Sequence, residues 1–164
     1  MTKQPHAAQD QPTGQAPPKT IRHQSLTGLR MRKHADYQRA YNAGRKRQSA
    51  SMCWFLAPRH PQLDARVTGP RVGLTAGKVV GKAHERNRIK RRMREALRRH
   101  TALFPQGYDL ILHPRRSVLT LDFAKLEAEV VRILQQAKAD AAKGLVQTPP
   151  SYSGEQPGPA KSAL

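Results

Sequence analysis

The sequence predicts an α+β fold in which helices pack on a single sheet. Segments with helical periodicity alternate along the chain with short apolar runs that proline or glycine interrupts. Their order is helix, strands, helix, strand and helix, which fits one sheet covered by helices. The length of 164 residues corresponds to one domain.

The first predicted element is a short helix over residues 34–43. Within it Tyr37, Ala40 and Tyr41 share one face at helical spacing. Gly44 follows directly and is the type of residue that ends helices in a left-handed conformation.

Two strands are expected next. Residues 51–57 (SMCWFLA) form an apolar run ended by Pro58, and residues 71–75 (RVGLT) form a second. The loop over 59–70 lies between them, so we expect the two strands to pair as a hairpin.

The second half of the domain adds a helix over 83–100, a strand over 108–113 stopped by Pro114, and a helix over 122–139. Asp122 is the expected N-cap of the last helix. An apolar stripe on that helix faces the core and comprises Phe123, Leu126, Val130, Ile133 and Leu134.

The two ends of the chain differ from this central part. Residues 1–28 and 143–164 are rich in proline and polar residues and show no periodicity. Such segments bury too little apolar surface to offset their loss of conformational entropy, so we expect both to be disordered. The predicted folded domain is therefore 29–142.

The charge of the chain restricts its partners. It has 30 Lys and Arg against 11 Asp and Glu, a net charge of +19, which favours nucleic acid or an anionic membrane. The apolar stretches, such as the one near Leu110–Leu112, fall far short of the roughly 18 residues that a membrane span needs. With no signal peptide and Cys53 as its single cysteine, the chain is expected in the cytoplasm. We expect no small-molecule substrate.

The helix over 83–100 carries most of this charge. From Lys82 to Arg99, nine of eighteen residues are Lys or Arg. At about 100° per residue, one narrow stripe is apolar and should face the sheet: Ile89, Met93, Ala96 and Leu97. The opposite face carries Asn87, Arg91, Arg94 and Arg98.

A solvated surface is the alternative interpretation of this helix. Solvated helices usually alternate Glu with Lys, whereas like charges four residues apart are destabilising. Only Glu85 and Glu95 dilute the charge here, and arginine predominates, whose planar fork suits phosphate. Because the helix has few side chains able to read bases, it favours recognition of backbone and shape, as in folded RNA.

This region resembles a known family. The segment from Arg71 to Arg91, RVGLTAGKVVGKAHERNRIKR, is similar to the signature of the bacterial ribonuclease P protein component. In that signature a strand of the R-V-G-L-T type precedes an R-N-R block that enters a helix. The similarity extends to the helix at Asp36–Tyr41, to Gly107–Asp109, and to Phe123–Leu134.

The resemblance implies an αβββαβα sandwich with a central four-stranded sheet, similar to the second domain of a small-subunit ribosomal protein. From the residues alone only three of those strands can be placed. It also implies a ribonucleoprotein that removes the 5′ leader of precursor tRNA with Mg²⁺. The partners would be the catalytic RNA subunit and precursor tRNA, and the RNA would carry the chemistry and hold most of the Mg²⁺.

The residues agree with a subunit that has no catalytic or metal-ligating side chains of its own, since the sequence shows no paired carboxylates and no His or Cys with ligand spacing. The expected RNA-binding residues are Lys78, Lys82, Arg86, Asn87, Arg88, Lys90, Arg91, Arg94 and Arg98.

In the family, a cleft between the first helix and the sheet holds the single-stranded leader. The resemblance assigns Tyr37, Tyr41 and Phe55 to that cleft, and aromatic faces do stack on bases. From the residues alone, aromatic side chains on a helix and a strand belong more often to the core. Trp54 points to the other face of its strand and is expected in the core, while Cys53 shares the side of Phe55.

The chain departs from the family at Gly77 and Val79, where a serine and a lysine are usual. Arg45, Lys46 and Arg47 are candidates to compensate for the lost charge. Two other functions stay open, a ribosomal-type RNA-binding protein and a stand-alone nuclease. A stand-alone nuclease is disfavoured because the sequence lacks a carboxylate cluster that could bind the metal ions of such an enzyme.

Overall fold

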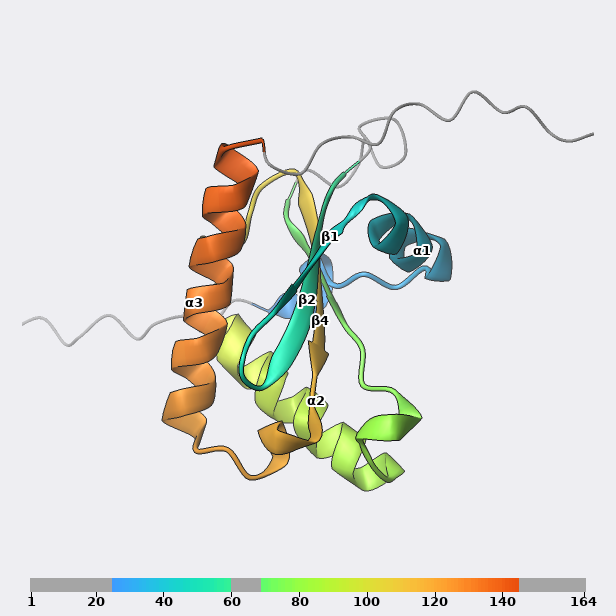
Figure 1. Ribbon diagram of the computed structural model, residues 1–164, viewed down its shortest axis with the longest axis vertical. Helices are drawn as coiled ribbons and strands as arrows, with labels where there is room; N and C mark the ends of the chain where they lie inside the picture. The colour runs from blue at the N-terminus through green and yellow to red at the C-terminus, as the bar shows by residue number, and fades with distance from the viewer. Residues whose placement is uncertain (1–24, 60–68, 145–164) are drawn as a thin grey trace, which may run out of the picture.

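The computed structural model describes residues 25–59 and 69–144, and within them the α+β prediction is confirmed. Three helices and four strands form the domain (Figure 1). They are α1 His34–Ala43, β1 Arg45–Gln48, β2 Met52–Pro58, β3 Arg71–Leu74, α2 Ala83–Arg98, β4 Tyr108–Pro114 and α3 Phe123–Ala142.

The strands form one sheet in the order β1-β2-β4-β3. Strand β2 is antiparallel to both β1 and β4, and β3 is parallel to β4. The predicted hairpin between the second and third strands is therefore wrong. Because β3 runs parallel to β4, the connection between those two strands crosses over through α2, and β4 inserts between β2 and β3.

Strand β1 is the strand that the sequence did not place. Its residues RKRQ carry no alternation of apolar and polar side chains, and their burial pattern is almost entirely exposed. Edge strands often carry such charge, because it discourages pairing with other chains.

Helices cover both faces of the sheet. Figure 1 shows α1 on one side and α2 with α3 on the other. The main core lies on the side of α2 and α3 and includes Trp54, Leu56, Leu110, Leu112 and Phe104, all almost fully buried. None of the described helices has both the length and the apolar composition for a membrane span.

The end of α1 differs in mechanism from the prediction. Gly44 does end the helix, but its φ of −86° is not left-handed. A side chain at this position would instead clash with the carbonyl oxygen of Ala40 and approach that of Leu56 to 3.2 Å. Glycine is needed here because the last turn of the helix, and to a lesser degree β2, leave no room for a side chain.

Other boundaries lie close to expectation. Asp122 caps α3 as predicted, accepting hydrogen bonds from the backbone N–H groups of Ala124 and Lys125. Most of the predicted disordered ends lies outside the described residues. Within them, a 3₁₀ turn over Leu26–Leu29 buries Leu26 in the main core, so ordered structure begins before residue 29.

A buried carboxylate also holds α3 to the sheet. Glu129 accepts hydrogen bonds from the Ser49 hydroxyl at 2.5 Å, from the Ser51 hydroxyl at 2.6 Å and from the Ser51 backbone N–H at 2.8 Å. Burial alone would raise the pKa of Glu129, but these hydrogen bonds outweigh it and the pKa is lowered. The turn between β1 and β2 is thereby tied to the middle of α3.

A buried ion network joins α1 to the sheet. The Arg71 guanidinium lies 2.8 Å and 2.6 Å from the two carboxylate oxygens of Asp109, and 3.1 Å from Asp36 of α1. All three side chains are less than a tenth exposed. Arg59 and Arg39 complete the network at its ends. Buried carboxylates of this kind need their partners, because an unpaired buried charge is costly.

We predict that Arg71→Met lowers the free energy of unfolding by about 3 kcal/mol, because Asp36 and Asp109 lose their shared buried partner. Urea denaturation of the full chain measures this. The matched control is Lys138→Met on the exposed side of α3, which should change stability by less than about 0.5 kcal/mol. Equal effects of the two substitutions would show that the network contributes nothing beyond a surface charge.

Candidate nucleic-acid interface

Helix α2 lies against the main core through the stripe that the sequence predicted. Ile89, Met93, Ala96 and Leu97 are at most 1% exposed. The remaining faces of this helix, with most of its cations, therefore point away from the sheet.

The start of α2 is fixed by a tight turn. Gly81 has a φ of 152°, in the region that favours glycine, and a side chain there would clash with the Glu85 carboxylate. That carboxylate instead accepts a hydrogen bond from the Lys82 backbone N–H at 2.7 Å, which lowers the pKa of Glu85. Glu85 also pairs with Arg116 at 2.7 Å, so it is fully engaged by the protein.

The predicted RNA-binding residues fall into groups that the sequence could not separate. Asn87, Arg88 and Arg91 are exposed on α2, and Lys78 and Lys82 are exposed just before it. Within the described parts of the chain, no carboxylate lies within ion-pair distance of these four cations. They form a surface whose charge the protein does not neutralise.

Two further predicted residues are occupied locally. Arg86 donates to the carbonyl oxygen of Gly81 at 2.9 Å, across the turn before the helix. Arg98 pairs with Glu95 at 2.5 Å. Both remain predictions as RNA contacts, but part of their hydrogen-bonding capacity is used within the fold.

Arg92 and Arg99, which flank this surface, act within the protein. Arg92 donates to the carbonyl oxygens of Leu119, at 2.6 Å, and Leu121, in the segment leading to α3. Arg99 pairs with Glu95 at 3.0 Å and lies over the Phe123 ring. Some arginines of the basic helix thus stabilise the fold, whereas others have no carboxylate partner among the described residues.

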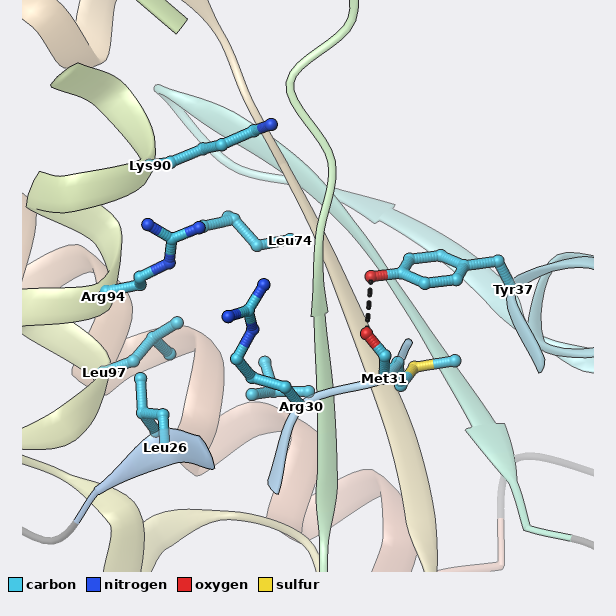
Figure 2. Close-up of a pocket in the computed structure, with 9 residues that line it drawn as sticks. Leu26, Arg30, Met31, Tyr37, Leu74, Lys90, Arg94 and Leu97 are labelled. Carbon is cyan, nitrogen blue, oxygen red and sulfur yellow. Dashed lines mark hydrogen bonds between the residues drawn. The ribbon is translucent and has the colours of Figure 1, made fainter. Parts of the chain in front are cut away.

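Lys90 and Arg94 line a pocket between α2, β3 and the segment before α1. Figure 2 shows both side chains projecting from α2 into the region between that helix and β3, which Arg30 enters from that segment. Burial, and then the charges of Arg30 and Arg91, lower the pKa of Arg94. Among the described residues no carboxylate pairs with the three cations that line the pocket, so they repel one another. The pocket is therefore suited to an anionic group.

Arg30 was not among the residues predicted from the sequence. Its backbone bridges to Val72 of β3, and the N–H of its neighbour Met31 donates to the Val72 carbonyl oxygen at 2.9 Å. The only signal in the sequence was a basic residue beside a methionine, which does not specify a pairing with Val72, 42 positions further along the chain.

The face of the sheet under α1 carries the predicted aromatic residues. Tyr37 lies directly on Gly73, where a side chain would come within 2.7 Å of the tyrosine ring. Tyr41 lies 6.4 Å from Tyr37 and 5.1 Å from Phe55, measured between ring centroids. The rings pack on a small cluster beneath α1, yet each stays half-buried. They are thus partly core and partly open surface.

A further ring belongs to this group. His113 of β4 is half-buried, lies 5.5 Å from the rings of both Tyr41 and Phe55, and bonds the Tyr41 hydroxyl through Nε2 at 2.9 Å. No local pattern in the sequence indicated this, because His113 joins the rings only through the pairing of β4 with β2, which places it opposite Cys53. Trp54 is 1% exposed on the other face, which confirms its expected place in the core.

The carboxylates near α2 do not fit a metal site. Glu85 and Glu95 are each held by arginine side chains or backbone N–H groups. In residues 25–59 and 69–144, no three His, Cys, Asp or Glu side chains gather closely enough to hold a metal ion.

Comparison with known proteins places this surface in context. A model of the family described as Ribonuclease P matches residues 27–138. A ribonuclease P protein component of Chloroflexus aggregans is 37% identical over 109 residues, covering 66% of this chain and 76% of the relative. The corresponding protein of Thermobifida fusca is 33% identical over 103 residues, covering 62% and 70%.

Solved structures have the same fold. The RNase P protein of Staphylococcus aureus aligns with a TM-score of 0.56 at 24% identity, over 67% of this chain and 95% of that one. The RNase P protein of Thermotoga maritima aligns with a TM-score of 0.56 at 23% identity, over 65% and 96%.

We predict that the two kinds of arginine on α2 differ in their effect on stability. Arg92→Ala should lower the free energy of unfolding by about 2 kcal/mol, because two carbonyl oxygens lose a charged donor. The double substitution Arg88→Ala with Arg91→Ala should change it by less than about 0.5 kcal/mol, since it removes only like charges in solvent. Thermal and urea unfolding would contradict the assignment if the double variant were the less stable.

Proposed function

The chain belongs to the ribonuclease P protein family, and from this premise we propose that it binds the catalytic RNA of ribonuclease P and the 5′ leader of precursor tRNA. Membership makes it part of an endoribonuclease ribonucleoprotein that processes tRNA. The observation that carries the finer proposal is the cationic surface of α2, whose charge the described residues leave unneutralised.

In this proposal the surface of α2 binds the phosphate backbone of the catalytic RNA. Arg88 and Arg91 are exposed, unpaired with carboxylates in the described structure, and held by a helix that is anchored in the core. A guanidinium can donate two parallel hydrogen bonds to a phosphate. Binding of this kind releases counterions and therefore weakens as salt is added.

The aromatic residues under α1 form the second part of the proposal. Tyr37, Tyr41 and Phe55 present half-buried rings on the open side of the sheet. Half-buried rings are held in place and still offer a face or an edge to an unpaired base. Stacking of this kind tolerates any base sequence, so in this proposal the rings accept leaders of different sequence.

We assign the hydrolysis itself to the RNA subunit. Mg²⁺ would be held mainly by that RNA, as the family resemblance implies, and the engaged carboxylates of α2 do not fit an ion of this kind. The protein would contribute binding energy and orientation, which can raise the rate without any catalytic side chain.

Reconstitution tests the proposal. The purified chain should cleave no precursor tRNA when it is incubated alone with Mg²⁺. Added to the catalytic RNA of the same organism at low Mg²⁺, it should restore removal of the 5′ leader at the mature end. Specific cleavage by the protein alone would identify a stand-alone nuclease, and no stimulation of the RNA would point to an RNA-binding protein of another kind.

A charge variant controls this experiment. Replacing Arg88 and Arg91 with Gln should weaken assembly with the RNA and flatten the plot of log affinity against log salt by about 0.7–0.9 for each lost contact. Arg99→Gln, whose side chain already pairs with Glu95, should leave that slope nearly unchanged.

The leader site has its own prediction. Phe55→Ala in the holoenzyme should weaken binding of precursor tRNA by roughly 5- to 150-fold, the range for loss of one stacked base. Binding of mature tRNA and assembly with the RNA should be unaffected, because neither involves a leader. Equal losses of affinity for the two tRNAs would show that the leader does not bind this face. Unfolding of the variant would show that Phe55 belongs to the core.

A further inference from the structure

The turn before α2 carries the one large hydrophobic side chain that is exposed within residues 25–59 and 69–144. This residue is Val79, in the middle of the 3₁₀ turn η2 Lys78–Val80, and it is 100% exposed. Its neighbour Val80 is partly buried and packs against the main core. Because Val80 already anchors the turn, the fold does not need a second apolar side chain beside it.

Hydrogen bonds hold this turn in one shape. Within it the N–H of Gly81 donates to the carbonyl oxygen of Lys78 at 3.2 Å. Arg86 of α2 donates to the carbonyl oxygen of Gly81 at 2.9 Å, so the turn is also tied to the helix that follows. Val79 is therefore presented in a fixed position, and a contact that it makes with a partner needs little further ordering.

Cations flank this valine. Lys78 and Lys82 are exposed on either side of it in the chain, and no described carboxylate pairs with either of them. Figure 1 shows the turn beside the start of α2, the helix that exposes Asn87 and Arg88. Val79 is thus an apolar point on the cationic surface that is assigned above to the catalytic RNA.

Simple exposure to solvent is the alternative, because single apolar side chains are common on protein surfaces. Val79 differs from such a residue in its place, since it is held rigidly among cations that lack partners in the described structure. An RNA whose phosphates bind those cations is drawn against the valine. The minor groove of an RNA helix is wide and shallow and displays ribose and base edges, so a short side chain can reach them.

Resting on the function proposed above, we propose that Val79 packs on the sugars and base edges of a shallow groove in the catalytic RNA, between phosphates bound by Lys78 and Lys82. Burial of the valine against RNA removes its methyl groups from water, which stabilises the complex without releasing counterions. This contact therefore contributes equally at low and at high salt, unlike the contacts of the two lysines.

Salt titrations of the full chain with the catalytic RNA, in the absence of tRNA, test this contact. Val79→Ala removes two methyl groups and should weaken binding about four- to fifteenfold, for one or both methyl groups buried at about 0.8 kcal/mol each. The loss should be the same at every salt concentration, so the slope of log affinity against log salt is unchanged. The matched control is the neighbouring Lys78→Gln, which should flatten that slope by about 0.7–0.9.

Three results would overturn the inference. Unchanged affinity of Val79→Ala would show that the side chain stays in solvent in the complex. A loss of affinity that shrinks as salt is added, as for Lys78→Gln, would show that the effect is electrostatic. A lower urea midpoint of the free Val79→Ala chain would show that the side chain supports the fold rather than the complex.

The double substitution Arg88→Gln with Arg91→Gln, measured in parallel, separates this inference from the function on which it rests. If the double variant loses affinity and Val79→Ala does not, the RNA binds the arginines of α2 without reaching the turn. If the double variant binds the RNA as tightly as the original chain and with the same slope, the cationic surface is not the RNA site and the proposed function itself fails.

Discussion

The buried Arg71 guanidinium is the contact on which the arrangement of this molecule depends. It joins Asp36 of α1 to Asp109 of β4 from its own position on β3, so one side chain fixes a helix against two strands. Charged groups are costly to bury, and removing one partner of such a network leaves the others buried and unpaired. Asp36 anchors α1 through this network. Tyr37, the next residue in the chain, therefore lies directly on Gly73 of β3.

The distribution of charge follows from a second constraint. A chain of +19 repels itself, and folding alone would favour more carboxylates among its arginines. The described carboxylates are engaged by groups of the protein itself, with Glu129 holding a turn and Glu95 pairing with Arg98 and Arg99. The cations that are left over gather on α2 and around one pocket. A partner that supplies phosphates would relieve the repulsion, which couples binding to stability.

The sequence predicted those parts of the structure that periodicity determines. The buried stripe of α2, the N-cap Asp122 and the core position of Trp54 follow from spacing within one element. The pairing of strands does not, because nothing in a local pattern says that β4 inserts between β2 and β3. Strand β1 lacked a pattern altogether. Arg30 and His113 were missed because each gains its role from a partner distant in the chain.

Two RNA partners are assigned to two faces of the protein, and mapping the leader on the protein tests this assignment most directly. A photoreactive nucleotide placed in the leader of precursor tRNA, bound to the full holoenzyme, can be crosslinked and the attached peptides identified by mass spectrometry. We expect crosslinks in α1, β2 and β4, at or next to Tyr37, Phe55 and His113, and none in α3. Crosslinks confined to the exposed side of α2 or to α3 would contradict it.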